Sequence, residues 1–142
     1  MRTRNAYPAA IGAAVLVGSL VAAAPAQAGG TNFTQSTGAC SMGSVWTLKA
    51  KPQLGGIELE FSVDTARAGQ TWAVRVTDNK NLLFTGNRVT NKISRSLSVN
   101  RLAADRTGID HFVARATNAK TGELCRGTLA FAPGGGGGGG KG

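Results

Sequence analysis

Hydrophobic and polar residues alternate along the middle of this chain. In residues 56–64, four apolar side chains occupy every second position and polar ones fill the gaps: Ile57, Leu59, Phe61 and Val63 against Glu58, Glu60, Ser62 and Asp64. Residues 70–78 place Trp72, Val74 and Val76 on one face and Thr71, Arg75 and Thr77 on the other. A period of two predicts strands with one buried and one solvated face.

Weaker alternation marks five more segments, at residues 44–51, 82–86, 92–100, 110–118 and 123–131. Glycine- and asparagine-rich turns separate most of them. The one position where a short helical turn is possible is residues 100–107. Seven short strands between Cys40 and Pro133 predict an all-β fold: a seven-stranded antiparallel sandwich of the immunoglobulin or fibronectin type III kind.

Two tryptophans share a strand face with the apolar residues around them. Trp46 and Trp72 are therefore expected to fill the core, where an aromatic ring buries a large area. A platform on which a sugar stacks is the functional alternative, but a tryptophan with that role would lie on the solvent-facing side of its strand.

The first 28 residues have the three regions of a secretory signal. Arg2 and Arg4 precede an apolar run from about Ala9 to Ala24, and Ala26-Gln27-Ala28 offers a cleavage site. A membrane anchor is the alternative, but the run is shorter than the roughly 20 residues that span a bilayer and is followed by Pro25. The pattern predicts release outside the cell through the general secretory route.

Cys40 and Cys125 are the only cysteines. In an oxidising compartment they are expected to form one disulfide, with alpha carbons within about 7 Å of each other. This bridge would fasten the beginning of the domain to its last strand. Catalytic or metal-binding use is the alternative; the chain has no Cys-x-x-Cys and a single histidine.

Two segments flank the domain at residues 40–133. Residues 29–39 are small and polar, and residues 134–142 are almost entirely glycine. Neither can bury enough apolar surface to offset the entropy of ordering, so both are expected to be flexible.

The chain is strongly basic, and loss of Arg2 and Arg4 with the leader would lower its net charge from +9 to +7. If the third, sixth and seventh predicted strands share a sheet, the outward positions include Arg75, His111, Arg115 and Arg126. Arginine suits bidentate contacts to carboxylate or phosphate. This face could bind an anionic cell-wall polymer, a polysaccharide or an extracellular protein. The alternative is a solvated face that prevents aggregation. Nucleic acid is disfavoured because both tryptophans are assigned to the core.

No residue pattern indicates catalysis, a metal or a cofactor. His111 follows Asp110, and neighbours on a strand point to opposite faces, so this aspartate cannot orient the imidazole. Glu58 and Glu60 share a face at roughly 7 Å, a separation that paired carboxylates of glycosidases also have. They lie on one strand with no cleft implied, and a solvated face is the simpler interpretation.

The strings WTLKAKPQLGGIELEFSVD, GQTW, FTGNRVT, GIDHFVARATN and TGELCRG cover most of residues 43–131. With them the chain resembles small secreted actinobacterial proteins that are mostly uncharacterised. The resemblance implies a secreted β-sandwich with one disulfide and transfers no site residues.

The sequence therefore predicts a secreted, non-enzymatic binding or structural module. The alternative is a small secreted inhibitor or carrier, for which residues 100–108, with Arg101 and Arg106, are the candidate loop.

Overall fold

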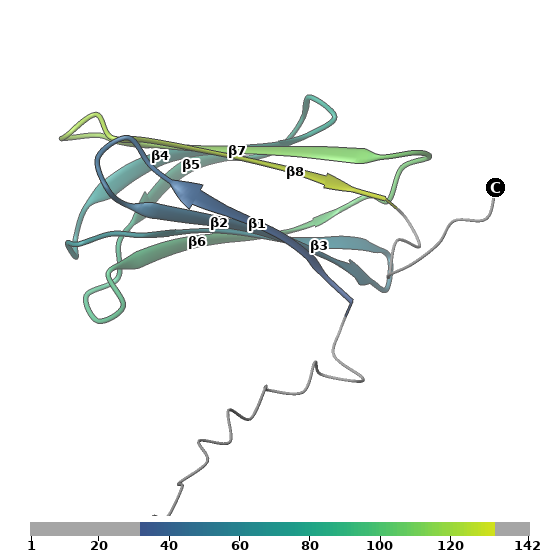
Figure 1. Cartoon of the computed structure of the whole chain (residues 1–142), viewed down its shortest axis with the longest axis horizontal. Helices are drawn as coiled ribbons and strands as arrows, with labels where there is room; N and C mark the ends of the chain where they lie inside the picture. The colour runs from purple at the N-terminus through teal and green to yellow at the C-terminus, as the bar shows by residue number, and fades with distance from the viewer. Residues whose placement is uncertain (1–31, 133–142) are drawn as a thin grey trace, which may run out of the picture. The chain divides into compact units, whose positions relative to one another are not determined.

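The computed structural model describes residues 32–132, and every regular element in this range is a strand (Figure 1). The predicted leader, residues 1–28, and the glycine-rich segment, residues 134–142, lie outside the described residues. The eight strands are β1 Thr34–Ala39, β2 Val45–Gln53, β3 Gly56–Asp64, β4 Thr71–Asp78, β5 Asn81–Val89, β6 Ser96–Ala103, β7 Asp110–Asn118 and β8 Leu124–Phe131. Residues 32–132 contain no helix that could span a membrane.

The strands form two four-stranded antiparallel sheets that pack face to face (Figure 1). Sheet A has the order β1-β2-β3-β6, and sheet B has the order β5-β4-β7-β8. The prediction of an all-β, antiparallel, sandwich-like fold is confirmed, with eight strands in place of seven. The possible helical turn at residues 100–107 is absent. Residues 100–103 continue β6 instead, because Ala103 pairs with Ile57 and is buried.

Strand β1 corrects the prediction of a flexible segment at residues 29–39 for its residues 34–39, while residues 29–31 lie outside the described residues. Residues 34–39 pair with β2 along their whole length, from Thr34 opposite Ala50 to Ala39 opposite Val45. The strand is polar, so its sequence carries no alternation of apolar residues. Its backbone hydrogen bonds with β2 and its contacts with β8 order it. Cys40 consequently follows the first strand, whereas the sequence placed it before the first strand.

The alternation read from the sequence matches the burial of the side chains. The inward positions of β3 are all buried, and Trp72 on β4 is fully buried. Trp46 on β2 is 9% exposed and also belongs to the core. Both tryptophans therefore fill the space between the sheets, and neither forms a solvent-facing platform.

The ring of Trp46 lies at the seam where β1 of sheet A meets β8 of sheet B. A methyl group added to Gly38 on β1 would come within 2.8 Å of one edge of the indole. A methyl group added to Gly127 on β8 would come within 2.7 Å of the opposite edge of the indole, at Cε3. Two glycines on different sheets thus make room for one large side chain.

The disulfide closes the same side of the sandwich. Cys40 and Cys125 are bonded, with their alpha carbons 4.4 Å apart, which confirms the predicted bridge. It joins the loop after β1 to β8, and so it ties an edge of sheet A to an edge of sheet B. On the other side, where β5 meets β6, the guanidinium groups of Arg88 and Arg101 lie 4.4 and 4.6 Å from the centre of the Phe84 ring.

Candidate functional site

Three of the predicted site residues form a straight row across sheet B. In the pairing of β4 with β7, Arg75 lies opposite Arg115, and in the pairing of β7 with β8, Arg115 lies opposite Arg126. All three are exposed, as their outward parity predicts. Thr85 on β5 lies opposite Arg75 and extends the row to the far edge of the sheet. We call Arg75, Arg115 and Arg126 the arginine row.

His111 faces outward from the same sheet but does not join the row. It is exposed and lies opposite Ala130, four residues from Arg115 on β7. At about 3.4 Å per residue, this places the two alpha carbons roughly 14 Å apart. The structure therefore brings together three of the four site residues that the sequence predicted.

The arginine row concentrates like charge. Neighbouring strands lie about 4.8 Å apart, so the alpha carbons of the row span roughly 10 Å. No arginine of the row has an ion-pair partner among the described residues. The outward positions of the four strands carry no carboxylate; they are Thr71, Ala73, Thr77, Leu82, Thr85, Asn87, Val89, Val113, Thr117, Leu124, Thr128 and Ala130, with His111 and the row itself. Like charges directly opposite each other destabilise a sheet by about 0.2–1 kcal/mol per pair.

The outer face of sheet A has the opposite arrangement. Lys49 on β2 lies opposite Glu60 on β3, and Lys51 lies opposite Glu58. The Lys51 ammonium is 3.4 Å from the Glu58 carboxylate. The two glutamates that the sequence offered as a carboxylate pair are thus each matched with a lysine on the neighbouring strand.

A pair of buried carboxyl groups lies on the inner face of sheet B, at the end where β4 finishes and β7 begins. Asp78 is 1% exposed and Asp110 is fully buried. One oxygen of Asp78 lies 3.8 Å from Nε of Arg106, and one oxygen of Asp110 accepts a hydrogen bond from Nδ2 of Asn79 at 3.3 Å. The second oxygen of each carboxyl has no hydrogen-bond donor among the described residues.

Burial raises the pKa of Asp78 above its ordinary value, and the negative charge of Asp110 raises this pKa further. The positive charges of Arg106 and His111 act in the opposite direction. Asp110 is buried while its neighbour His111 is exposed, so the two side chains point to opposite faces, as predicted.

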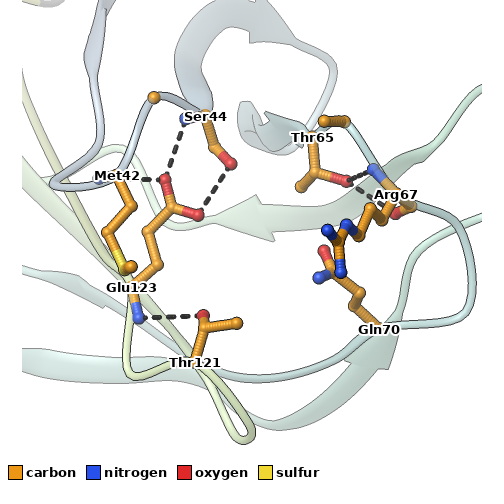
Figure 2. Close-up of a pocket in the computed structure, with 9 residues that line it drawn as sticks. Met42, Ser44, Thr65, Arg67, Gln70, Thr121 and Glu123 are labelled. Carbon is orange, nitrogen blue, oxygen red and sulfur yellow. Dashed lines mark hydrogen bonds between the residues drawn. The ribbon is translucent and has the colours of Figure 1, made fainter.

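The end of the sandwich opposite to Asp78 and Asp110 has a hollow of about 310 Å³ (Figure 2). The sequence did not predict this hollow. Glu123, in the loop before β8, accepts hydrogen bonds from the backbone amides of Met42 and Ser44 and from the Ser44 hydroxyl, at 3.2, 2.8 and 2.9 Å. Arg67 and Gln70 line the opposite side of the hollow. A lone glutamate in a loop gives no sequence signal for such a contact.

Residues 32–132 contain no group of three or more His, Cys, Asp or Glu side chains arranged to hold a metal ion. No family model, curated protein or solved structure matches this chain.

Proposed function

We propose that this protein is a secreted, non-enzymatic binding module that holds an anionic extracellular polymer on the arginine row. The observation that carries the proposal is the register of Arg75, Arg115 and Arg126 on a face without carboxylates. A guanidinium group presents a planar fork of donors that fits carboxylate and phosphate, and three such groups in line multiply the contacts with a polymer.

The two outer faces of the same molecule strengthen this interpretation. A face that has only to stay soluble can do so with matched charges, as on sheet A, where Lys49 and Lys51 lie opposite Glu60 and Glu58. Sheet B instead carries unmatched arginines at three adjacent positions, which costs stability when nothing is bound. An anionic partner would remove that cost.

The secreted character of the proposal rests on the sequence of residues 1–28 and is compatible with the disulfide. The non-enzymatic character is supported by the separate positions of the candidate acids and bases, with Asp110 buried, His111 exposed, and the two glutamates of β3 facing lysines.

We also propose the immunoglobulin or fibronectin type III type for the sandwich. Strands β2, β3 and β6 on one sheet, against β5, β4, β7 and β8 on the other, give the crossing connections of a Greek key. Strand β1 is then an addition at the edge of sheet A.

The test of the binding function uses immobilised heparin as the anionic polymer. The wild-type protein should stay bound at about 0.5 M salt, where the screening length has fallen to about 4 Å and general charge attraction is weak. The variant Arg75→Ala/Arg115→Ala/Arg126→Ala should elute at low salt.

The matched control removes three positive charges elsewhere, in Lys49→Ala/Lys51→Ala/Lys92→Ala. These lysines lie on sheet A and in the loop before β6, and this variant should elute close to the wild type. Equal elution of both triple variants would show that net charge, and not the row, is responsible.

The hollow next to Glu123 favours a second candidate function, that of a carrier for a small polar ligand. Its volume of about 310 Å³ is at the lower end for small-molecule sites. Native mass spectrometry of protein taken from the culture medium of the producing organism would show a bound mass in this case. Residues 100–108 give less support to an inhibitor, since residues 100–103 belong to β6.

A further inference from the structure

The direction of the arginine row defines how a polymer would lie on sheet B, and this inference rests on the proposed function. The row runs across the strands, with one arginine on each of β4, β7 and β8. Along each strand, the next residues on the same face are uncharged. Ala73 and Thr77 flank Arg75, Val113 and Thr117 flank Arg115, and Leu124 and Thr128 flank Arg126.

The two directions across the sheet therefore offer a polymer different numbers of charges. A chain lying along one strand would meet a single arginine, because the same-face positions at about 7 Å on either side are neutral. A chain lying across the strands would meet three arginines in succession, about 4.8 Å apart. Most of the flanking side chains are short, so the guanidinium groups can rise above the surface between them.

We infer that the ligand is a linear polyanion with one anionic group on each unit, and that it crosses the strands so that three consecutive units contact Arg75, Arg115 and Arg126. At one end of the row, Arg75 lies opposite the uncharged Thr85 on the edge strand β5. At the other end, Arg126 lies on β8, which is also an edge strand. A polymer can therefore extend beyond both ends of the row. The site has room for three units and no fixed end.

The charge of the site sets its salt dependence. Three anionic groups that are neutralised by three arginines release counterions, and the slope of log K against log salt concentration should be roughly −2 to −3. An anionic membrane is the other flat polyanion that a basic sheet could meet. The alignment of the arginines in a single line favours a linear chain over a bilayer surface, which would be contacted equally well by scattered charges.

The probe is a series of oligogalacturonates from one to six units, which carry one carboxylate on every sugar ring. Binding is measured by calorimetry at low salt with the full exported chain. For the wild type, affinity should rise about tenfold or more between one and three units. Beyond three units it should rise only by the small factor that extra binding registers provide.

Single variants of the row give a sharper signature. Arg75→Gln and Arg126→Gln each leave two adjacent arginines, so the two-unit oligomer should bind as it does to the wild type while the gain from the third unit disappears. Arg115→Gln leaves no adjacent pair, so the two-unit oligomer should bind no better than the single unit. Each variant should make the salt slope shallower by about one.

Thermal melting of each variant checks the fold, which should be unchanged or slightly more stable because outward-facing repulsion is relieved. If Arg115→Gln fails to fold, Arg115→Lys keeps the charge and removes the bidentate fork. The gain in affinity between one and two units should then become smaller, while the salt slope should stay as in the wild type.

Three outcomes would overturn the crossing arrangement: affinity independent of length, equal losses in all three single variants, or binding to anionic vesicles through the row without a length step for oligomers. If heparin retention still depends on the row in these cases, the proposed function survives and only the orientation is wrong. If the row has no effect on heparin either, both fail.

Discussion

The packing of Trp46 between two glycines gives a quantitative test of how the sandwich closes. Gly127 on β8 has no positive φ, so alanine is acceptable to its backbone, and only space is in question. The added methyl would lie 2.7 Å from the indole of Trp46. That distance is too short for two carbon atoms in contact, so the ring or the strand must shift.

The expected magnitude comes from two opposing effects. Overpacking a core by one methyl group costs about 1–3 kcal/mol. Replacing glycine with alanine inside a strand gains about 0.5–1 kcal/mol, because alanine loses less backbone entropy on folding. Gly127→Ala should therefore lower the free energy of unfolding by about 1–2 kcal/mol, which is a fall in Tm of roughly 5–10 °C for a domain of this size.

The same substitution should lose its cost when the ring is absent. Trp46→Leu alone should cost about 2–4 kcal/mol through the lost burial. In that background Gly127→Ala should be neutral or slightly stabilising. The double-mutant cycle should thus show a coupling energy of about 1–3 kcal/mol.

Guanidinium denaturation, followed by the fluorescence of Trp72, measures all four proteins, because Trp72 is present in each. Ala130→Gly, at an exposed position of the same strand, serves as a control and should cost about 0.5–1 kcal/mol in both backgrounds. A cost for Gly127→Ala that is the same with and without the indole would refute the packing of Trp46 against β8.

Two further predictions concern the buried carboxyl groups. Asp78→Asn supplies an amide donor to the unsatisfied oxygen of Asp110 and should raise the free energy of unfolding by about 1 kcal/mol at pH 7. Because the pKa of Asp78 is raised in the folded state, the wild-type fold is stabilised while this acid is protonated and loses stability as the pH rises. The difference in unfolding free energy between Asp78→Asn and the wild type, measured by denaturation, should therefore shrink as the pH falls from 7 toward 4. An equal difference at both pH values would contradict the raised pKa of Asp78. Glu123→Gln turns an acceptor of three hydrogen bonds into a neutral amide and should lower the free energy of unfolding of the oxidised protein by about 2 kcal/mol; a loss below about 0.5 kcal/mol would show that these bonds contribute little.

The alternation of apolar and polar residues along the strands was sufficient to predict much of this fold. Alternation identified which side chains enter the core, including both tryptophans, and it placed the three arginines on one outer face. The cysteine count predicted the disulfide because only one intramolecular pairing exists. These predictions succeed because each depends on a local pattern or on a single possible combination.

The features that the sequence did not reveal depend on contacts between distant segments. Strand β1 has no apolar alternation, and its order comes from its partner β2. Residues 101–103 extend β6 because β3 lies beside them. The contacts of Glu123 with Ser44 and Met42 join residues about 80 positions apart. No local pattern reports such pairings.

The arginine row lies between these two cases. The sequence could place its members on one face, but only the register of β4, β7 and β8 brings them into a line. Folding depends on the inward positions of these strands, which are buried and, apart from Asp78, Asp110 and Asn118 at the strand ends, apolar or small. It leaves the outward positions free to carry many residue types. Three adjacent unmatched arginines are therefore not required by the sandwich and act against its stability. We propose that their cause lies in what this face contacts, and sheet B is therefore the first place to test for the proposed anionic partner.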